Sequence, residues 1–219
     1  MTWKRRVFDN FRLYAITDLS VPDPSILSKI TAAFKNGTDI VQLRAKHLST
    51  TDKMRLGRAI RKIANRMKKL YFVNDSLDLA LATDADGLHV GQDDLPPRVV
   101  RALCRRFKRT LFLGLSSHSV IQARKAQLEP IDYFAVGPVF STPTKPDYEA
   151  VGLQLVEKVS HFARKPWVVI GGIDKTNVRR VLDSGAERVA VVRAIFQASN
   201  PAKASRELFN ILQEEDHGQ

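Results

Sequence analysis

The amino-acid sequence predicts an α/β fold, a single (β/α)8 or TIM barrel, in which eight parallel strands alternate with helices. Short apolar runs rich in Val, Ile and Leu recur along the chain, and each precedes a segment whose apolar residues have helical spacing. Strands that are apolar on both faces are typical of a parallel sheet covered by helices. A chain of 219 residues is long enough for one such barrel. We therefore expect one domain over residues 1–219, with residues 1–10 as a short segment before the first strand.

The expected strands occur in regular order. Apolar residues at Ile26, Ile30 and Phe34 illustrate the helical spacing that follows each strand. A doubly wound open sheet is the alternative, but no GxGxxG turn follows the first apolar run. The eight strands are expected at Leu13–Thr17, Ile40–Leu43, Leu70–Val73, Gly87–Val90, Leu111–Leu115, Tyr133–Val139, Trp167–Ile170 and Val189–Ile195.

The composition and the charge pattern favour neither a membrane protein nor a nucleic-acid-binding protein. No apolar run approaches the length of a membrane span, and the basic first ten residues lead into no apolar signal segment, so we expect a cytoplasmic protein with no membrane partner. The single cysteine, Cys104, suits a reducing compartment. The net charge of +12 resides mostly on helices, where solvated faces are the simpler interpretation than a nucleic-acid surface, because no nucleic-acid-binding motif accompanies it. Such a field would attract phosphorylated small molecules.

Two acidic turns follow the third and fourth strands. Asn74 and Asp75 end the third strand, and Asp94 follows the fourth. The carboxyl ends of parallel strands meet at the same rim of a barrel, so the two carboxylates are expected together, where Mg²⁺ could bind them. Local pattern equally fits two helix N-caps, since each Asp precedes a helical segment.

Cationic and amide side chains end the second strand. Gln42, Arg44 and Lys46 alternate, so all three could point into the mouth of the barrel. Two cations and an amide on one face favour an anionic ligand, because burying them without one would be costly. A strand end that frays into solvent is the alternative.

The later strand ends add hydroxyl groups and a phosphate cradle. Ser116 and His118 follow the fifth strand, and Thr142, Thr144 and Lys145 lie in a proline-bounded loop after the sixth. Ser116 and His118 suggest no nucleophilic triad. Gly171-Gly172 follows the seventh strand, where the backbone can approach a ligand and helix N-termini can bind phosphate. The whole rim predicts an enzyme that handles two phosphorylated groups, one of them a diphosphate.

Several segments together resemble the thiamine phosphate synthase family. They are YAITD, VQLRAK, NDSLDLALATDADGLHVGQDDL, GLSSHS, DYFAVGPVFSTPTKPD, VVIGGI and GAERVAVVRAI. The resemblance runs from about Leu13 to about Pro201 and covers nearly every strand end. It implies a transferase of thiamine biosynthesis that joins a pyrimidine diphosphate to a thiazole phosphate. Thiamine phosphate and pyrophosphate are the products, Mg²⁺ is required, and departure of the diphosphate leaves a carbocation.

The resemblance also implies a role for each matching residue. Asp75 and Asp94 would hold the metal ion, and the backbone at Gly172, Val192 and Arg193 would hold the thiazole phosphate. Catalysis would rest on Arg44, Lys46, Lys145 and Ser116. The diphosphate would be bound by Arg44, Lys46, Asn74 and Lys145, and the pyrimidine and the departing group would be flanked by Gln42, Ser116, Thr142 and Thr144.

One departure and two rival functions accompany the resemblance. Many family members carry Ser where this chain has Arg193, which is tolerable if that position contributes its backbone N–H. The nearest rival is a thiazole tautomerase-like relative with His118 as acid and base, which would lack the acidic pair. The other rival is a basic, non-catalytic nucleic-acid-binding protein, which would stay on heparin at moderate salt. A homo-oligomer is compatible with the sequence.

Overall fold

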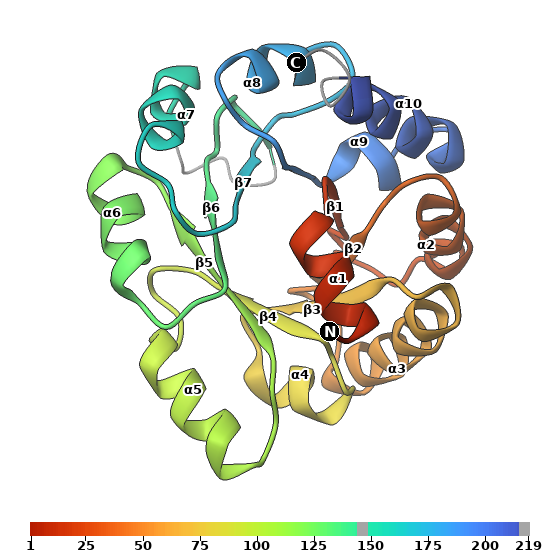
Figure 1. The fold of residues 1–219 in the computed structure, drawn as a ribbon. Helices are drawn as coiled ribbons and strands as arrows, with labels where there is room; N and C mark the ends of the chain where they lie inside the picture. The colour runs from red at the N-terminus through yellow and green to blue at the C-terminus, as the bar shows by residue number, and fades with distance from the viewer. Residues whose placement is uncertain (144–148, 215–219) are drawn as a thin grey trace.

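The computed structural model describes residues 1–143 and 149–214, and their strands form a closed parallel barrel in the order β1 to β8 (Figure 1). The barrel closes through β1 and β8, where Tyr14 is paired with Ala190. The strands are β1 (Leu13–Ile16), β2 (Ile40–Leu43), β3 (Leu70–Asn74), β4 (Gly87–Val90), β5 (Phe112–Ser117), β6 (Tyr133–Val136), β7 (Trp167–Ile170) and β8 (Val189–Val191). The helices are α1 (Trp3–Asn10), α2 (Ile26–Lys35), α3 (Thr50–Met67), α4 (Leu77–Ala82), α5 (Pro97–Arg106), α6 (Val120–Leu128), α7 (Leu153–Ser160), α8 (Val178–Asp183), α9 (Arg193–Phe196) and α10 (Pro201–Glu214). The predicted (β/α)8 barrel is confirmed.

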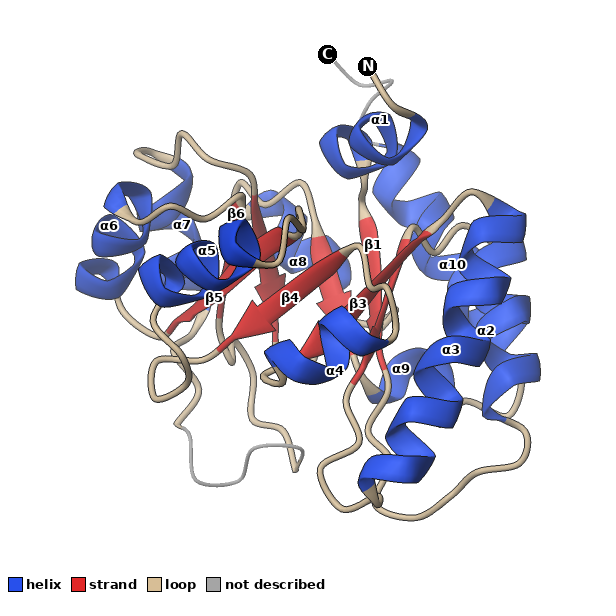
Figure 2. Cartoon of the chain, turned by 90° about the horizontal axis from the view of Figure 1, so that it is seen from below, coloured by secondary structure: helices blue, strands red, loops and turns tan. Residues whose placement is uncertain are grey.

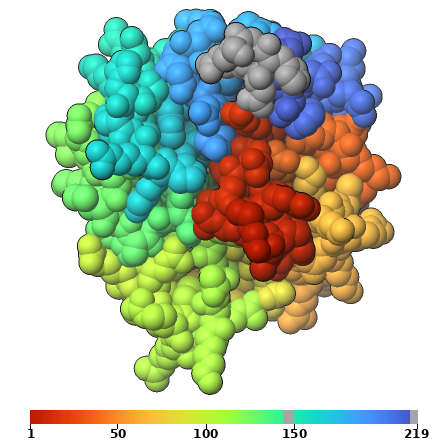
Figure 3. Space-filling model, in the orientation of Figure 1, coloured from red at the N-terminus to blue at the C-terminus, as the bar shows by residue number. Residues whose placement is uncertain are grey.

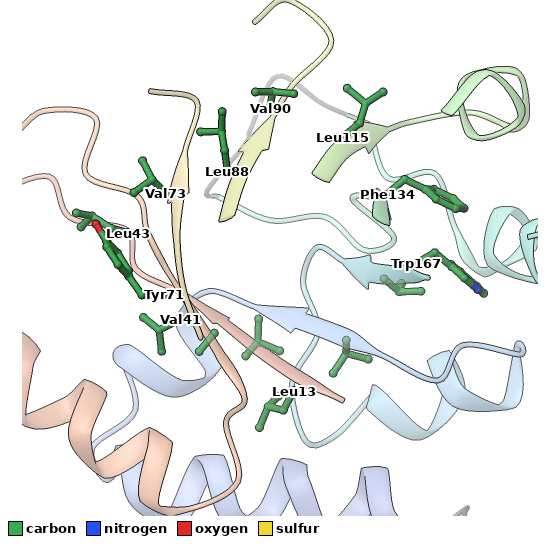
Figure 4. Packing of buried hydrophobic residues seen from close by; sticks show 14 of the residues in the cluster. Leu13, Val41, Leu43, Tyr71, Val73, Leu88, Val90, Leu115, Phe134 and Trp167 are labelled. Atoms are coloured by element: carbon green, nitrogen blue, oxygen red, sulfur yellow. The ribbon is translucent and has the colours of Figure 1, made fainter. Parts of the chain in front are cut away.

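One hydrophobic layer lies between the strands and the surrounding helices (Figure 4). Alternate residues of each strand, such as Leu13 and Ala15 of β1, point outward into this layer and are fully buried. Helices contribute their apolar stripes to it, for example Ile30 and Phe34 of α2. Burial on both faces explains why the strands read as continuous apolar runs in the sequence.

A second hydrophobic cluster, with several aromatic rings, fills the inside of the barrel. Phe8 of α1 stacks on Phe112 with ring centroids 4.1 Å apart, and Phe11, Phe72 and Tyr133 surround it. Helix α1 lies across one end of the barrel, over the centre in the space-filling view (Figure 3) and above the strands in the turned view (Figure 2). The amino-terminal segment therefore closes the end of the barrel at which the strands begin.

The bounds of several expected strands need correction, among them the fifth, which runs over Phe112–Ser117 and therefore includes Ser116. The last apolar run was expected as one strand over Val189–Ile195, but β8 ends at Val191 and Arg193–Phe196 forms the short helix α9. Its apolar residues Ile195 and Phe196 are buried as part of a helix, which periodicity cannot distinguish from a strand over so few residues. The sixth strand likewise ends at Val136, not at Val139. None of the described helices is long and apolar enough to cross a membrane.

Candidate active site

A pocket of about 310 Å³ opens at the carboxyl ends of the strands. Its floor is made by side chains that point into the barrel, including Tyr14, Ile16 and Ala135, and its wall is made by residues that follow the strands. Of the predicted site residues, eight line it: Gln42, Arg44, Asn74, Ser116, Thr142, Gly172, Val192 and Arg193. The topology therefore brings together the ends of six different strands, as expected for the functional face of such a barrel.

Asp75 and Asp94 lie together on the same rim, although they are separated by a helix and a strand in the sequence. Their carboxyl groups are within hydrogen-bonding distance of each other. Burial raises the pKa of Asp75 to about 6, and the hydrogen bond and negative charge of Asp94 add to that rise. The nearby charges of Lys46 and Arg44 oppose it.

The N-cap interpretation of the two Asp residues is wrong. Ser76 is the N-cap of α4, and Asp75 itself has a left-handed backbone with φ of 62°. Pro96 is the N-cap of α5, and Asp94 instead accepts a 2.7 Å hydrogen bond at Oδ2 from the backbone N–H of Gly91. Neither carboxylate is therefore used to begin a helix, which leaves both available on the rim.

The predicted alternation of Gln42, Arg44 and Lys46 holds only in part, because β2 ends at Leu43. Gln42 points into the barrel and is 2% exposed, and Arg44 lines the pocket. Lys46 lies in the exposed loop beyond the strand, close enough to Asp75 to lower the pKa of that carboxyl group. Arg44 also forms an ion pair with Asp18, which follows β1. The sequence analysis assigned no role to Asp18, because its partner lies at the end of a different strand.

Sequence reasoning missed the two tyrosines inside the barrel. Tyr14 and Tyr133 are fully buried, and their hydroxyl oxygens are 3.2 Å apart. His89 joins this pair to Ser116, since its Nδ1 lies 2.9 Å from the Tyr133 hydroxyl and its Nε2 lies 3.0 Å from the Ser116 hydroxyl. A tyrosine within an apolar run carries no signal of such a contact, because its partner is on another strand.

The backbone after β7 adopts the geometry that only glycine readily allows. Gly171 has a φ of 108° and Gly172 a φ of 65°. A Cβ added at Gly171 would lie 2.3 Å from Cα of Pro138, and one added at Gly172 would lie 2.7 Å from Cβ of Phe140. Packing against the segment after β6 therefore accounts for both glycines, in addition to the place that they take in the pocket wall.

The remaining predicted residues are divided between the pocket and the undescribed loop. Thr142 lines the pocket, whereas Thr144 and Lys145 lie outside the described residues. His118 also lines the pocket, and its Nδ1 lies 2.5 Å from the carbonyl oxygen of Gly137. Arg193 lies at the start of α9 with Val192 as the N-cap residue, and no side-chain hydrogen bond caps that helix.

A carboxylate pair, cations and a pocket lined in part by polar side chains meet at one rim, which resembles the sites of enzymes that act on phosphorylated compounds, and comparison with known proteins agrees. The family model described as thiamine monophosphate synthase matches residues 13–195. The chain belongs to the thiamine monophosphate synthase family.

Individual members of the thiamine monophosphate synthase family support this assignment. The chain is 39% identical over 211 residues to the thiamine-phosphate synthase of Synechococcus, covering 95% of this chain and 59% of that protein. It is 40% identical to the thiamine-phosphate synthase of Thermobifida fusca, covering 93% of each. The structure of thiamine phosphate pyrophosphorylase from Pyrococcus furiosus superposes with a TM-score of 0.84 at 33% identity, over 93% of this chain and 96% of that one. The chain thus spans little more than half the length of its cyanobacterial relative.

Proposed function

We propose that this protein is a thiamine phosphate synthase. It would join the methylene carbon of a pyrimidine diphosphate to the ring nitrogen of a thiazole phosphate and release pyrophosphate. The observation that carries the proposal is the meeting of Asp75 and Asp94 near Lys46 and near Arg44, which lines the pocket. Two carboxylates and two cations are the groups needed to bind a metal-bound diphosphate.

The carboxylate pair fits Mg²⁺. Among the described residues no cluster of three or more acidic, histidine or cysteine side chains could hold a metal ion. Mg²⁺ does not require one, because it is commonly held by one or two carboxylates together with substrate phosphates and water. Asp75 and Asp94 repel each other when both are ionised, and a divalent cation between them would offset that repulsion. When bound, Mg²⁺ would neutralise negative charge that develops on the departing diphosphate.

The protein's own groups would stabilise the same leaving group. Arg44 lines the pocket next to the carboxylate pair, and Asn74 ends β3 directly before Asp75. Both can donate hydrogen bonds to phosphate oxygens, and Lys46 adds a positive charge nearby. Thr144 and Lys145, outside the described residues, would complete this half of the site by the family resemblance.

Departure of the diphosphate breaks the bond between the methylene carbon and oxygen, and the oxygen keeps the electron pair. The resulting pyrimidine carbocation needs no enzymatic nucleophile, because the thiazole nitrogen supplies the electron pair for the new carbon–nitrogen bond. Gln42 and Ser116 on the pocket wall would orient the pyrimidine, with Thr142 beside the departing group. Most of the catalytic effect would then come from charge stabilisation at the leaving group.

The thiazole phosphate would bind at the ends of β7 and β8. Gly172, Val192 and Arg193 line this side of the pocket, and their backbone N–H groups are candidates for phosphate oxygens. The exposed Arg193 guanidinium could add a charge-assisted contact to the same phosphate. The substitution of Arg for the family's usual Ser at this position is therefore compatible with function.

The direct test is incubation of the purified protein with both substrates and Mg²⁺, followed by chromatographic detection of thiamine phosphate and pyrophosphate in equal amounts. Reactions without Mg²⁺, or without either substrate, should give no product. Absence of product from the complete mixture, with folded protein shown by circular dichroism, would contradict the proposal.

A further inference from the structure

Five hydrogen-bonded side chains cross the inside of the barrel beneath the pocket. The amide Nε2 of Gln42 donates to the Tyr14 hydroxyl at 2.7 Å, and the Tyr14 and Tyr133 hydroxyls are 3.2 Å apart. His89 continues the series with its two ring nitrogens, to Tyr133 at 2.9 Å and to Ser116 at 3.0 Å. We call this series the Gln42–Ser116 chain. Its members come from five strands: Gln42, Tyr14, Tyr133, His89 and Ser116 on β2, β1, β6, β4 and β5.

Both tyrosines of the Gln42–Ser116 chain are buried and remain protonated. Burial raises the pKa of Tyr14 and of Tyr133 well above the ordinary value, so each hydroxyl keeps its single hydrogen. The Tyr133 ring packs directly against Gly114. A Cβ added at Gly114 would lie 2.2 Å from Cζ of Tyr133. Aromatic contacts with Phe8 and Phe72, at centroid distances of 6.0 Å each, hold the same ring.

Because each tyrosine hydroxyl has only one hydrogen, the hydrogen bonds of the Gln42–Ser116 chain can run in one direction. Tyr14 accepts from Gln42, so its own hydrogen is left for its other neighbour, and we assign Tyr14 as the donor to Tyr133. With its oxygen accepting from Tyr14, Tyr133 would use its own hydrogen for Nδ1 of His89. A histidine whose Nδ1 accepts a hydrogen bond carries its hydrogen on Nε2, and that nitrogen faces the Ser116 hydroxyl oxygen. With its oxygen accepting from His89, Ser116 has its own hydrogen available for the pocket.

We propose that the Gln42–Ser116 chain fixes His89 as the Nε2–H tautomer and thereby holds the Ser116 hydroxyl as a hydrogen-bond donor to the bound pyrimidine diphosphate. Tyr14, Tyr133 and His89 are then positioning residues that act through Ser116. The inference rests on the proposed function for the identity of the substrate, but the direction of the chain is a property of the free protein. The opposite direction would make Ser116 donate to His89 and leave its oxygen as an acceptor toward the substrate.

The tautomer is measured on the ligand-free protein with ¹⁵N-labelled histidine. The protein has five histidines, and the His89 signals are those lost in His89→Asn. We expect nitrogen chemical shifts and ring couplings of a neutral imidazole with the hydrogen on Nε2. A hydrogen on Nδ1, or a doubly protonated ring at neutral pH, would overturn the proposal whether or not the protein makes thiamine phosphate.

Removal of one hydroxyl tests the link from the chain to turnover. Tyr133→Phe takes away the donor to Nδ1, so the His89 signals should shift toward a mixture of tautomers, and kcat should fall about tenfold with a smaller change in KM. Tyr71→Phe is a matched control, because Tyr71 is also fully buried and its hydroxyl lies 3.2 Å from a buried threonine hydroxyl on the outer side of β3. An unchanged kcat in Tyr133→Phe, or equal losses in the two variants, would contradict the proposal.

Replacement of the histidine gives a second measure that does not depend on the tyrosines. His89→Gln can place an amide N–H near the position of Nε2, whereas His89→Asn is too short and places its amide near Nδ1. Gln should therefore restore a larger share of kcat than Asn. If the wild-type protein makes no thiamine phosphate while the Nε2–H tautomer is observed, the proposed function fails and the direction of the chain stands. Turnover in the wild type with equal loss in both His89 variants would overturn the role of His89 as a donor.

Discussion

The two ends of the barrel place opposite kinds of neighbour beside a carboxylate, which is buried at one end and half-buried at the other. At the end where the strands begin, the fully buried side chain of Asp86 contacts Lys4 at 2.7 Å and Arg61 at 2.5 Å, and it also accepts a hydrogen bond from the backbone N–H of Tyr71. At the end where the strands finish, Asp75 has another carboxylate, Asp94, within hydrogen-bonding distance. A carboxylate surrounded by cations supports the fold, whereas the repulsion between two neighbouring carboxylates is offset only in part by Lys46 and Arg44, since the pKa of Asp75 stays raised.

Loss of a rim carboxylate should have the largest effect. Asp75→Asn and Asp94→Asn each remove a charge from the proposed Mg²⁺ site, so turnover should fall on the order of 1000-fold while circular dichroism stays native. Asp93→Asn is the matched control, because Asp93 is the exposed neighbour of Asp94 and should keep full turnover. Full turnover in both rim variants would remove the pair from the mechanism.

The opposite end should respond through stability. Asp86→Ala leaves Arg61 with an uncompensated charge in a buried position, so the free energy of unfolding should fall by about 3–5 kcal/mol. Asp84→Asn breaks the exposed pair with Arg109, keeps a side chain that tolerates the left-handed backbone at φ of 55°, and should cost at most about 1 kcal/mol. Urea unfolding measures both values. Turnover per folded molecule should stay normal in Asp86→Ala. A loss of turnover without a loss of stability would contradict the assignment of Asp86 to the stability of the fold.

Arg44 tests the division of the pocket between its two substrates. Arg44→Ala should raise KM for the pyrimidine diphosphate about 10- to 100-fold, because charge-assisted hydrogen bonds to phosphate are lost. KM for the thiazole phosphate should change by less than about threefold, since that phosphate is assigned to the ends of β7 and β8. Arg58→Ala, an exposed arginine of α3, serves as the control. Equal changes for both substrates would contradict the assignment of the two halves.

The raised pKa of Asp75 predicts a gain of stability when its charge is removed. The pKa rises from 3.8 to about 6 on folding, so the folded protein binds this proton more tightly than the unfolded chain. The stability that this proton provides is lost as the pH rises from about 4 to 6. In metal-free solution at pH 8, Asp75→Asn should therefore unfold with a free energy about 1–2 kcal/mol higher than wild type, after allowance for solvent screening. The difference should shrink toward pH 4 in urea titrations, and a constant difference would argue against this origin.

His118 is expected to have the smallest effect. It lines the pocket and its Nδ1 lies close to the backbone oxygen of Gly137, which suits a role in holding the loop after β6. His118→Ala should lower kcat by about fivefold or less, the worth of one hydrogen bond. Steady-state kinetics over a range of pH provide the measurement. Complete loss of turnover would favour the acid–base chemistry of a tautomerase-like relative.

Much of this organisation is readable from local pattern. Continuous apolar strands and helical spacing predicted the barrel, because burial of both strand faces leaves a periodic record in the sequence. The barrel topology then predicted that Asp75 and Asp94 lie at one rim, since parallel strands end on the same side. The pattern failed where local signals coincide, as at Ile195 and Phe196, whose apolar character suits a strand or a helix equally.

The sequence by itself determined the barrel, the rim that carries the chemistry and the residue types on that rim. Only the tertiary structure decided contacts that the sequence did not predict, such as the ion pair of Arg44 with Asp18. The tertiary structure also places α1 over the end of the barrel where the strands begin, and it brings Tyr14 and Tyr133 together beneath the pocket. The physical reason is that strand and helix periodicities are local, whereas these contacts depend on how neighbouring strands are staggered around a closed barrel.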